Sequence, residues 1–127
     1  MINAKAAFSG FSVDDQAKAK EFYADKLGLK LIDETMGLSF ALPGGSGEIY
    51  AYPKDDHQPA TFTILNFVVK DIDATVEDLK GQGIKFESYE GMTDEQGIAR
   101  GISQNRGPDI AWFKDPAGNI LAVLKNA

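Results

Sequence analysis

Cysteine is absent from this chain of 127 residues, and histidine occurs once, at His57. Without cysteine, the chain can form no disulfide bond, no zinc–thiolate centre and no thiolate nucleophile. No apolar run approaches the roughly 20 residues that a membrane helix needs. The first ten residues also lack the apolar stretch of a signal peptide, so we expect a cytoplasmic protein with no membrane partner.

Positive charge is scarce. The chain has 13 lysines and arginines against 19 acidic residues, which gives a formal net charge of −6. Nucleic acids and anionic membranes both bind to positively charged faces, so neither is expected as a partner. The remaining composition, 43% hydrophobic and 25% charged, is ordinary for a globular protein. A chain of this length can bury a core without disulfide or metal cross-links.

The chain contains an internal repeat. Residues 11–32 align with residues 67–88, so that Asp15 matches Asp71 and Gly28 matches Gly83. In each copy an extended run ends in an acid that can cap a helix, either Asp14 or Asp15 in the first copy and either Asp71 or Asp73 in the second. A glycine ends each helix. A strand then follows, at 28–31 in the first copy and at 83–86 in the second. Glycine-rich and proline-rich turns at 43–47, 105–109 and 115–119 separate further short strands.

This pattern predicts an α+β fold. Two βαβββ modules, residues 1–53 and 61–127, are joined by a linker at 54–60 and together form a single domain over 1–127. One helix covers one face of each mixed sheet. The two sheets are expected to curl side by side into a partial barrel around a central cleft, where a ligand would bind.

Three segments carry a resemblance to a known family: "AKEFYADKLGLKL" at 19–31, "VVKDIDATVEDLKGQGIKF" at 68–86 and "FKDPAGNILAV" at 113–123. In order and spacing they resemble the vicinal-oxygen-chelate superfamily. It includes glyoxalase I, extradiol dioxygenases, bleomycin-resistance proteins and metal-type fosfomycin-resistance proteins. The resemblance implies the glyoxalase/bleomycin-resistance/dioxygenase fold and a homodimer. It does not select among lyases, oxygenases, epimerases and binders.

Enzymes of this superfamily hold one divalent ion with His or Glu on the first and last strand of each half. Carried over by position, the four ligand sites fall at Phe8, Tyr50, Ile64 and Ala122, with Ile49 and Ala51 as alternatives to Tyr50. Phenyl, alkyl and methyl groups offer no lone pair to a metal. The oxygen-bearing neighbours, Ser9, Glu48 and Asn66, would make a poor transition-metal site, and His57 is expected to be a solvated linker residue. We therefore expect no metal and no cofactor.

The expected cleft wall is aromatic and apolar, with a few polar groups. Its expected members are Phe8, Phe40, Tyr50, Tyr52, Ile64, Asn66, Arg100, Arg106, Trp112, Ile120 and Ala122. Aromatic rings can stack on a planar ligand, and an arginine can bind a carboxylate or a phosphate. The two arginines can equally pair with surface acids. Trp112 and Phe113 must face opposite sides of their strand, and the sequence does not decide which one faces the cleft.

Three classes of function stay open. The first is a metal-free protein, similar to the drug-binding members of the superfamily, that binds a small aromatic or amphipathic molecule and releases it unchanged. The second is an enzyme, a lyase, an isomerase or a dioxygenase-like protein with non-standard site residues. Glu48 and Tyr50 are its candidate base and proton donor. The third is an interaction domain whose cleft is filled by its own side chains. We favour the binder over the enzyme.

Overall fold

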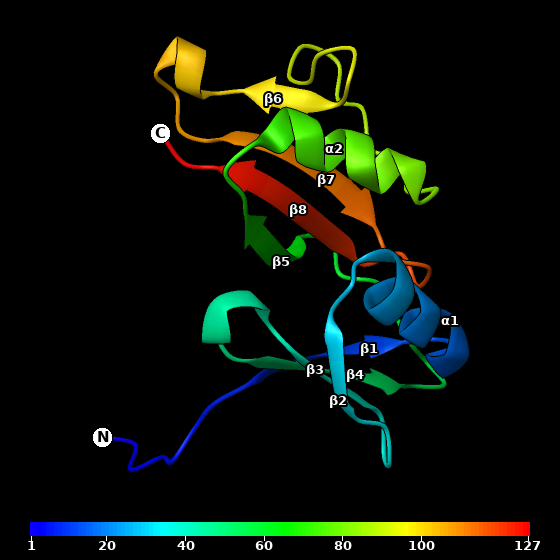
Figure 1. Cartoon of the computed structure of the whole chain (residues 1–127). Helices are drawn as coiled ribbons and strands as arrows, with labels where there is room; N and C mark the ends of the chain where they lie inside the picture. The colour runs from blue at the N-terminus through cyan, green and yellow to red at the C-terminus, as the bar shows by residue number, and fades with distance from the viewer. The chain divides into compact units, whose positions relative to one another are not determined.

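The structure, a computed structural model, describes all residues 1–127 and divides them into two compact units, Met1–Pro59 and Ala60–Ala127. Each unit has a mixed four-stranded sheet with helical cover on one face (Figure 1). The expected α+β fold with a repeated βαβββ order is therefore confirmed. Neither helix has the length and apolar character that crossing a membrane requires.

The first unit begins with strand β1 (Ser9–Val13) and helix α1 (Gln16–Lys20), which continues into the π-helical turn η1 (Glu21–Lys26). Strands β2 (Lys30–Asp33) and β3 (Leu38–Ala41), the 3-10 turn η2 (Pro43–Gly45) and strand β4 (Glu48–Pro53) follow. The strand order is β1-β4-β3-β2. Strand β1 pairs with β4 in parallel, and the other pairs are antiparallel.

The helix of the first unit starts and ends where the sequence predicts. Asp15 accepts a hydrogen bond from the Lys18 backbone N–H at 3.1 Å, and Gly28 ends the helical segment with a φ of +74°. The apolar side of this segment is buried against the sheet. Its Tyr23 ring is fully buried and lies 5.7 Å, centroid to centroid, from the ring of Phe40 on β3.

The second unit begins with strand β5 (Thr63–Val68) and helix α2 (Ile72–Gly81). Strand β6 (Ile98–Arg100), the 3-10 turn η3 (Ile102–Gln104) and strands β7 (Asp109–Lys114) and β8 (Ile120–Lys125) follow. The order is β5-β8-β7-β6, with β5 parallel to β8 and α2 lying across one face of the sheet (Figure 1). Asp71 caps α2 through the Ala74 N–H at 3.0 Å, and Gly83 has a φ of +86°.

One predicted strand is reduced to a single bridge. The segment 83–86 was expected to form a strand, but only Phe86 pairs, antiparallel to Phe113 on β7. The chain then leaves the sheet and returns as β6. The Asp94 carboxylate directs this return, because its Oδ1 accepts hydrogen bonds from the N–H groups of Gln96 and Ile98 at 2.9 Å each. Two short segments thus share the edge that one strand would occupy.

The turn between β7 and β8 is a buried hydrogen-bonded clamp. Asp115 and Asn119 are only 5% and 2% exposed. The Asp115 Oδ1 accepts from the Ala117 and Asn119 N–H groups, and its Oδ2 accepts from Asn119 Nδ2 at 3.0 Å. The Asn119 Oδ1 in turn accepts from the Ala60 N–H at 3.2 Å. The polar residues of this motif therefore close the β7–β8 turn and link it to the segment that precedes β5.

Candidate functional site

Each sheet has one face that its own helix does not cover, and we call it the helix-free face. Residue alternation assigns side chains to the two faces. On β4, Ile49 and Ala51 are buried, whereas Tyr50 and Tyr52 lie half-buried on the helix-free face. On β7, Ala111 and Phe113 are fully buried and Trp112 is half-buried on the helix-free face. The structure thus decides between the two β7 rings: Phe113 belongs to the core.

Aromatic rings cover the helix-free face of the first sheet. The Tyr50 and Tyr52 rings stack with centroids 5.7 Å apart, and Phe8 meets Tyr50 edge-on at 6.3 Å. The backbone positions beside Tyr50 are small, Gly10 on β1 and Ser39 on β3, so that its ring can lie over the sheet. The Tyr50 hydroxyl donates to the Met36 carbonyl at 2.8 Å. We call the three rings the tyrosine face.

The helix-free face of the second sheet carries a cavity of about 410 Å³. We call it the Trp112 hollow. It is lined by Gly91, Met92, Ala99, Arg100, Gly101, Gln104, Arg106, Pro108, Ile110 and Trp112. The indole of Trp112 is held in place by Tyr89, whose ring meets it edge-on at 5.5 Å. A volume of this size lies within the range of about 300–1,000 Å³ that small-molecule sites occupy.

The two arginines have different roles. The guanidinium of Arg100 forms a two-point ion pair with Asp73 at the start of α2, at 2.6 and 3.1 Å, and its Nε donates to Asp94 at 3.0 Å. It is therefore turned toward the helix, and only other parts of Arg100 line the Trp112 hollow. Arg106 is exposed and forms no salt bridge.

These ion pairs set the charge states around Arg100. The hydrogen bond from Arg100 holds the pKa of Asp73 below its usual value. Burial acts to raise the pKa of Asp94, but hydrogen bonds from the Ile98 N–H, from Arg100 and from the Gln96 N–H together lower it. The hydrogen bond with Asp73 raises the pKa of Arg100. All three groups stay ionised at neutral pH, and the network ties β6 to α2.

A family model described as the Glyoxalase/Bleomycin resistance protein/Dioxygenase superfamily matches residues 7–123. The chain belongs to this superfamily. The match covers both modules, including both capped helices and the clamp at 115–119. A search of curated protein sequences found no significant match.

Solved structures share the fold over nearly the whole chain. TnmS3, an antibiotic-binding protein from Streptomyces sp. CB03234, has a TM-score of 0.71 at 20% identity and covers 100% of this chain and 99% of its own. A superfamily member from Sphaerobacter thermophilus has a TM-score of 0.70 at 22% identity, covering 96% and 97%. A glyoxalase/bleomycin resistance protein from the same Streptomyces strain has a TM-score of 0.65 at 22% identity, covering 94% and 99%.

The residues at the positions where the resemblance implies metal ligands do not fit a divalent ion. Phe8 and Ile64 offer no lone pair, and Ala122 is a fully buried methyl group between Asn66 and Trp112 on neighbouring strands. Ile64 lies at an irregularity in the pairing of β5 with β8. Tyr50 has an oxygen, but a phenol whose hydroxyl already donates a hydrogen bond to the Met36 carbonyl is a poor metal ligand. The chain contains no cluster of three His, Asp or Glu side chains suited to a metal.

The remaining polar candidates are dispersed. Glu48 is exposed and lies on the same face of β4 as Tyr50, but the Tyr50 hydroxyl already donates to a backbone carbonyl. This arrangement does not favour Glu48 and Tyr50 as a base–donor pair. Asn66 is exposed on the helix-free face of β5, and Ile120 lies half-buried on the same face of β8.

Two residues differ from their expected settings. Phe40 does not face a ligand, because it is fully buried on the helix side of β3 against Tyr23. His57 is not a solvated linker residue: it is half-buried, and its Nδ1 lies 2.6 Å from the Ser12 hydroxyl on β1. Nothing near His57 in the sequence indicates this bond, since Ser12 lies 45 residues away.

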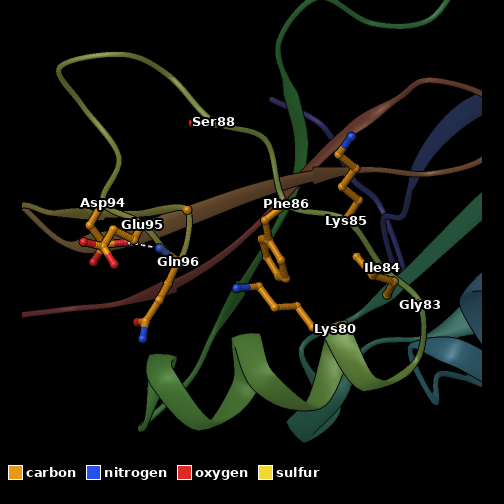
Figure 2. Close-up of a pocket in the computed structure, with 10 residues that line it drawn as sticks. Lys80, Gly83, Ile84, Lys85, Phe86, Ser88, Asp94, Glu95 and Gln96 are labelled. Atoms are coloured by element: carbon orange, nitrogen blue, oxygen red, sulfur yellow. Dashed lines mark hydrogen bonds between the residues drawn. The ribbon is translucent and has the colours of Figure 1, made fainter.

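A second cavity, of about 380 Å³, lies on the helix side of the second unit. Figure 2 shows Lys80 below the Phe86 ring, with its amino end pointing toward the side on which Asp94, Glu95 and Gln96 lie. Charges of both signs therefore face this cavity, and the Asp94 carboxylate is already bonded to Arg100 and to two backbone N–H groups. This lining favours no single class of ligand.

Proposed function

We propose that this protein binds a small aromatic or amphipathic molecule without using a metal ion. The observation that carries the proposal is the Trp112 hollow, in which an indole and several aliphatic side chains lie beside the polar residues Arg100, Gln104 and Arg106. Mostly apolar pockets with a few polar groups are typical of small-molecule sites. Binding without a metal is supported by the residues at the four expected ligand positions, which are Phe8, Tyr50, Ile64 and Ala122.

The tyrosine face is proposed as a second binding element. Its rings at Phe8, Tyr50 and Tyr52 offer flat apolar surface at low entropic cost, because an aromatic side chain has few rotatable bonds. Burying about 200 Å² of apolar ligand surface would contribute about 5 kcal/mol before the cost of association. That is enough for weak to moderate binding.

The fold itself is compatible with this role. TnmS3, which shares the fold over the full chain, is an antibiotic-binding protein. At 20% identity this likeness supports binding of a small molecule as a class and says nothing about which molecule. In this proposal the protein binds its ligand and releases it unchanged, and it catalyses no reaction step.

A thermal-shift screen followed by fluorescence tests the proposal. Because Trp112 is the single tryptophan of the chain, its emission reports directly on occupancy of the hollow. We expect at least one aromatic or amphipathic compound to raise Tm and to change this emission, equally with and without a chelator. The variant Ile110→Glu, which places a charge in the hollow and keeps the tryptophan, should lose both effects. A well-folded protein that no member of a broad panel stabilises would contradict the proposal.

A further inference from the structure

We infer that the ligand of the Trp112 hollow carries a negatively charged group, bound by Arg106, on an aromatic or apolar body. This inference rests on the proposed function and names the class of ligand. The acidic charge of the whole chain would suggest the opposite, a cationic ligand. The local charge around the hollow decides otherwise.

The lining of the hollow is locally basic. It includes two arginines and no aspartate or glutamate, although the chain has 19 acidic residues. The charge of Arg100 is compensated by Asp73 and Asp94 on the helix side of the sheet. Arg106 is thus the one uncompensated charge of the lining. Screening limits the influence of distant acids to about 8 Å at physiological ionic strength, so this local charge controls the contact with a bound ligand.

The loop that carries Arg106 is fixed by its own hydrogen bonds. The Gly101 carbonyl accepts from the N–H groups of Arg106 and Gln104 at 2.9 and 3.1 Å, and the Asp109 carboxylate accepts from the Ile102 N–H at 3.0 Å. A side chain at position 101 would collide with the Pro108 carbonyl oxygen, so the loop closes tightly on the glycine. This restraint holds the Arg106 backbone at the rim of the hollow, which reduces the ordering cost of binding.

The chemistry of the two parts defines the ligand. A guanidinium offers a planar fork of donors that matches a carboxylate or another oxyanion. The indole of Trp112 and the side chains of Ile110 and Met92 offer an apolar wall in the same cavity. An oxyanion joined to an aromatic ring satisfies both parts at once. A cationic ligand would meet an uncompensated positive charge and no acid.

The test uses three probes of the same shape: phenylbutyrate, phenylbutanol and phenylbutylamine. Each is titrated into the protein while the emission of Trp112 is followed, with excitation that tyrosine does not absorb. We expect phenylbutyrate to bind about tenfold more tightly than phenylbutanol, as a charge-assisted hydrogen bond implies, and phenylbutylamine to bind most weakly. In Arg106→Gln the affinity for phenylbutyrate should fall to that for phenylbutanol. The affinity for phenylbutanol should stay unchanged.

Lys70→Gln is the matched control, because it removes one positive charge from an exposed residue of the same unit that does not line the hollow, and it should keep the preference for the acid. Equal binding of acid and alcohol to the unaltered protein would overturn the inference and leave the proposed function standing. Retention of the preference in Arg106→Gln would also overturn it. If none of the three probes changes the emission, the inference fails, and the panel screen then decides the proposed function separately.

Discussion

The substitution Asn119→Ala tests the claim that the turn at 115–119 is a structural clamp. The side chain of Asn119 is 2% exposed, accepts from the Ala60 N–H and donates to the Asp115 carboxylate. Its removal leaves one backbone donor and one carboxylate oxygen without these partners. Each such loss costs about 1–3 kcal/mol, so we expect the free energy of unfolding to fall by about 3 kcal/mol. For a chain of this size that lowers Tm by about 10 °C.

The assay is chemical denaturation followed by circular dichroism, with thermal unfolding as a second readout. Asn66→Ala is the matched control, because it makes the same change at an exposed residue of the same unit. We expect the control to change the free energy of unfolding by less than about 0.5 kcal/mol. A loss of under about 1 kcal/mol in Asn119→Ala, or equal losses in both variants, would refute the clamp.

Three further predictions concern stability. Phe40→Ala should lower the free energy of unfolding by about 3–5 kcal/mol, measured by urea unfolding, because the Phe40 ring is fully buried. A loss under about 1 kcal/mol would contradict the burial of Phe40 in the core. Gly37→Ala should lower Tm, because its Cβ would lie 2.7 Å from the Tyr50 hydroxyl oxygen at a φ of +155°, and Tyr50→Ala should remove part of that loss. Because the pKa of Asp73 is lowered in the folded state, its ion pair stabilises the fold fully above the unfolded pKa of about 3.9. This stabilisation is lost as the pH falls through the folded pKa. Acidification should therefore destabilise Arg100→Gln less than the unaltered protein, and parallel Tm–pH curves would contradict this.

Much of the architecture could be predicted because its signals are local. An acidic cap at the start of each helix and the helix-ending glycines Gly28 and Gly83 depend on a few adjacent residues. The structure confirms them and selects Asp15 and Asp71 from the two candidate acids at each helix start. The repeat then supplied the order of elements. The prediction of a strand at 83–86 was wrong because strand formation there depends on pairing with the distant strand β7. Most of the free edge of β7 pairs with β6 instead.

The face of a strand was harder to predict than the strand itself. Alternation shows that Trp112 and Phe113 point in opposite directions, but only the position of α2 decides which ring is buried. Phe40 was misplaced for the same reason, because the helix segment that carries Tyr23 covers its side of the sheet. Knowledge of one buried residue on each strand would have assigned the rest.

The distinction between the arginines required the fold. Arg100 and its partner Asp73 come from different elements, and nothing near Arg100 in the sequence indicates this pair. Arg106 lies on a loop whose closure depends on the contact of Gly101 with the backbone at 107–108. Sequence reasoning could name both arginines as binding candidates. The structure separates the one that links β6 to α2 from the one without an ion pair.

Metal analysis tests the central claim most directly. Protein purified without chelators, and then equilibrated with zinc, manganese, nickel or ferrous ions and desalted, should retain far less than one ion per chain. Its Tm and its affinity for phenylbutyrate should not change after this treatment, because Phe8, Ile64 and Ala122 offer no ligand and Tyr50 offers only a bonded phenol. One tightly held transition-metal ion per chain, with binding of the probe lost on chelation, would contradict the account.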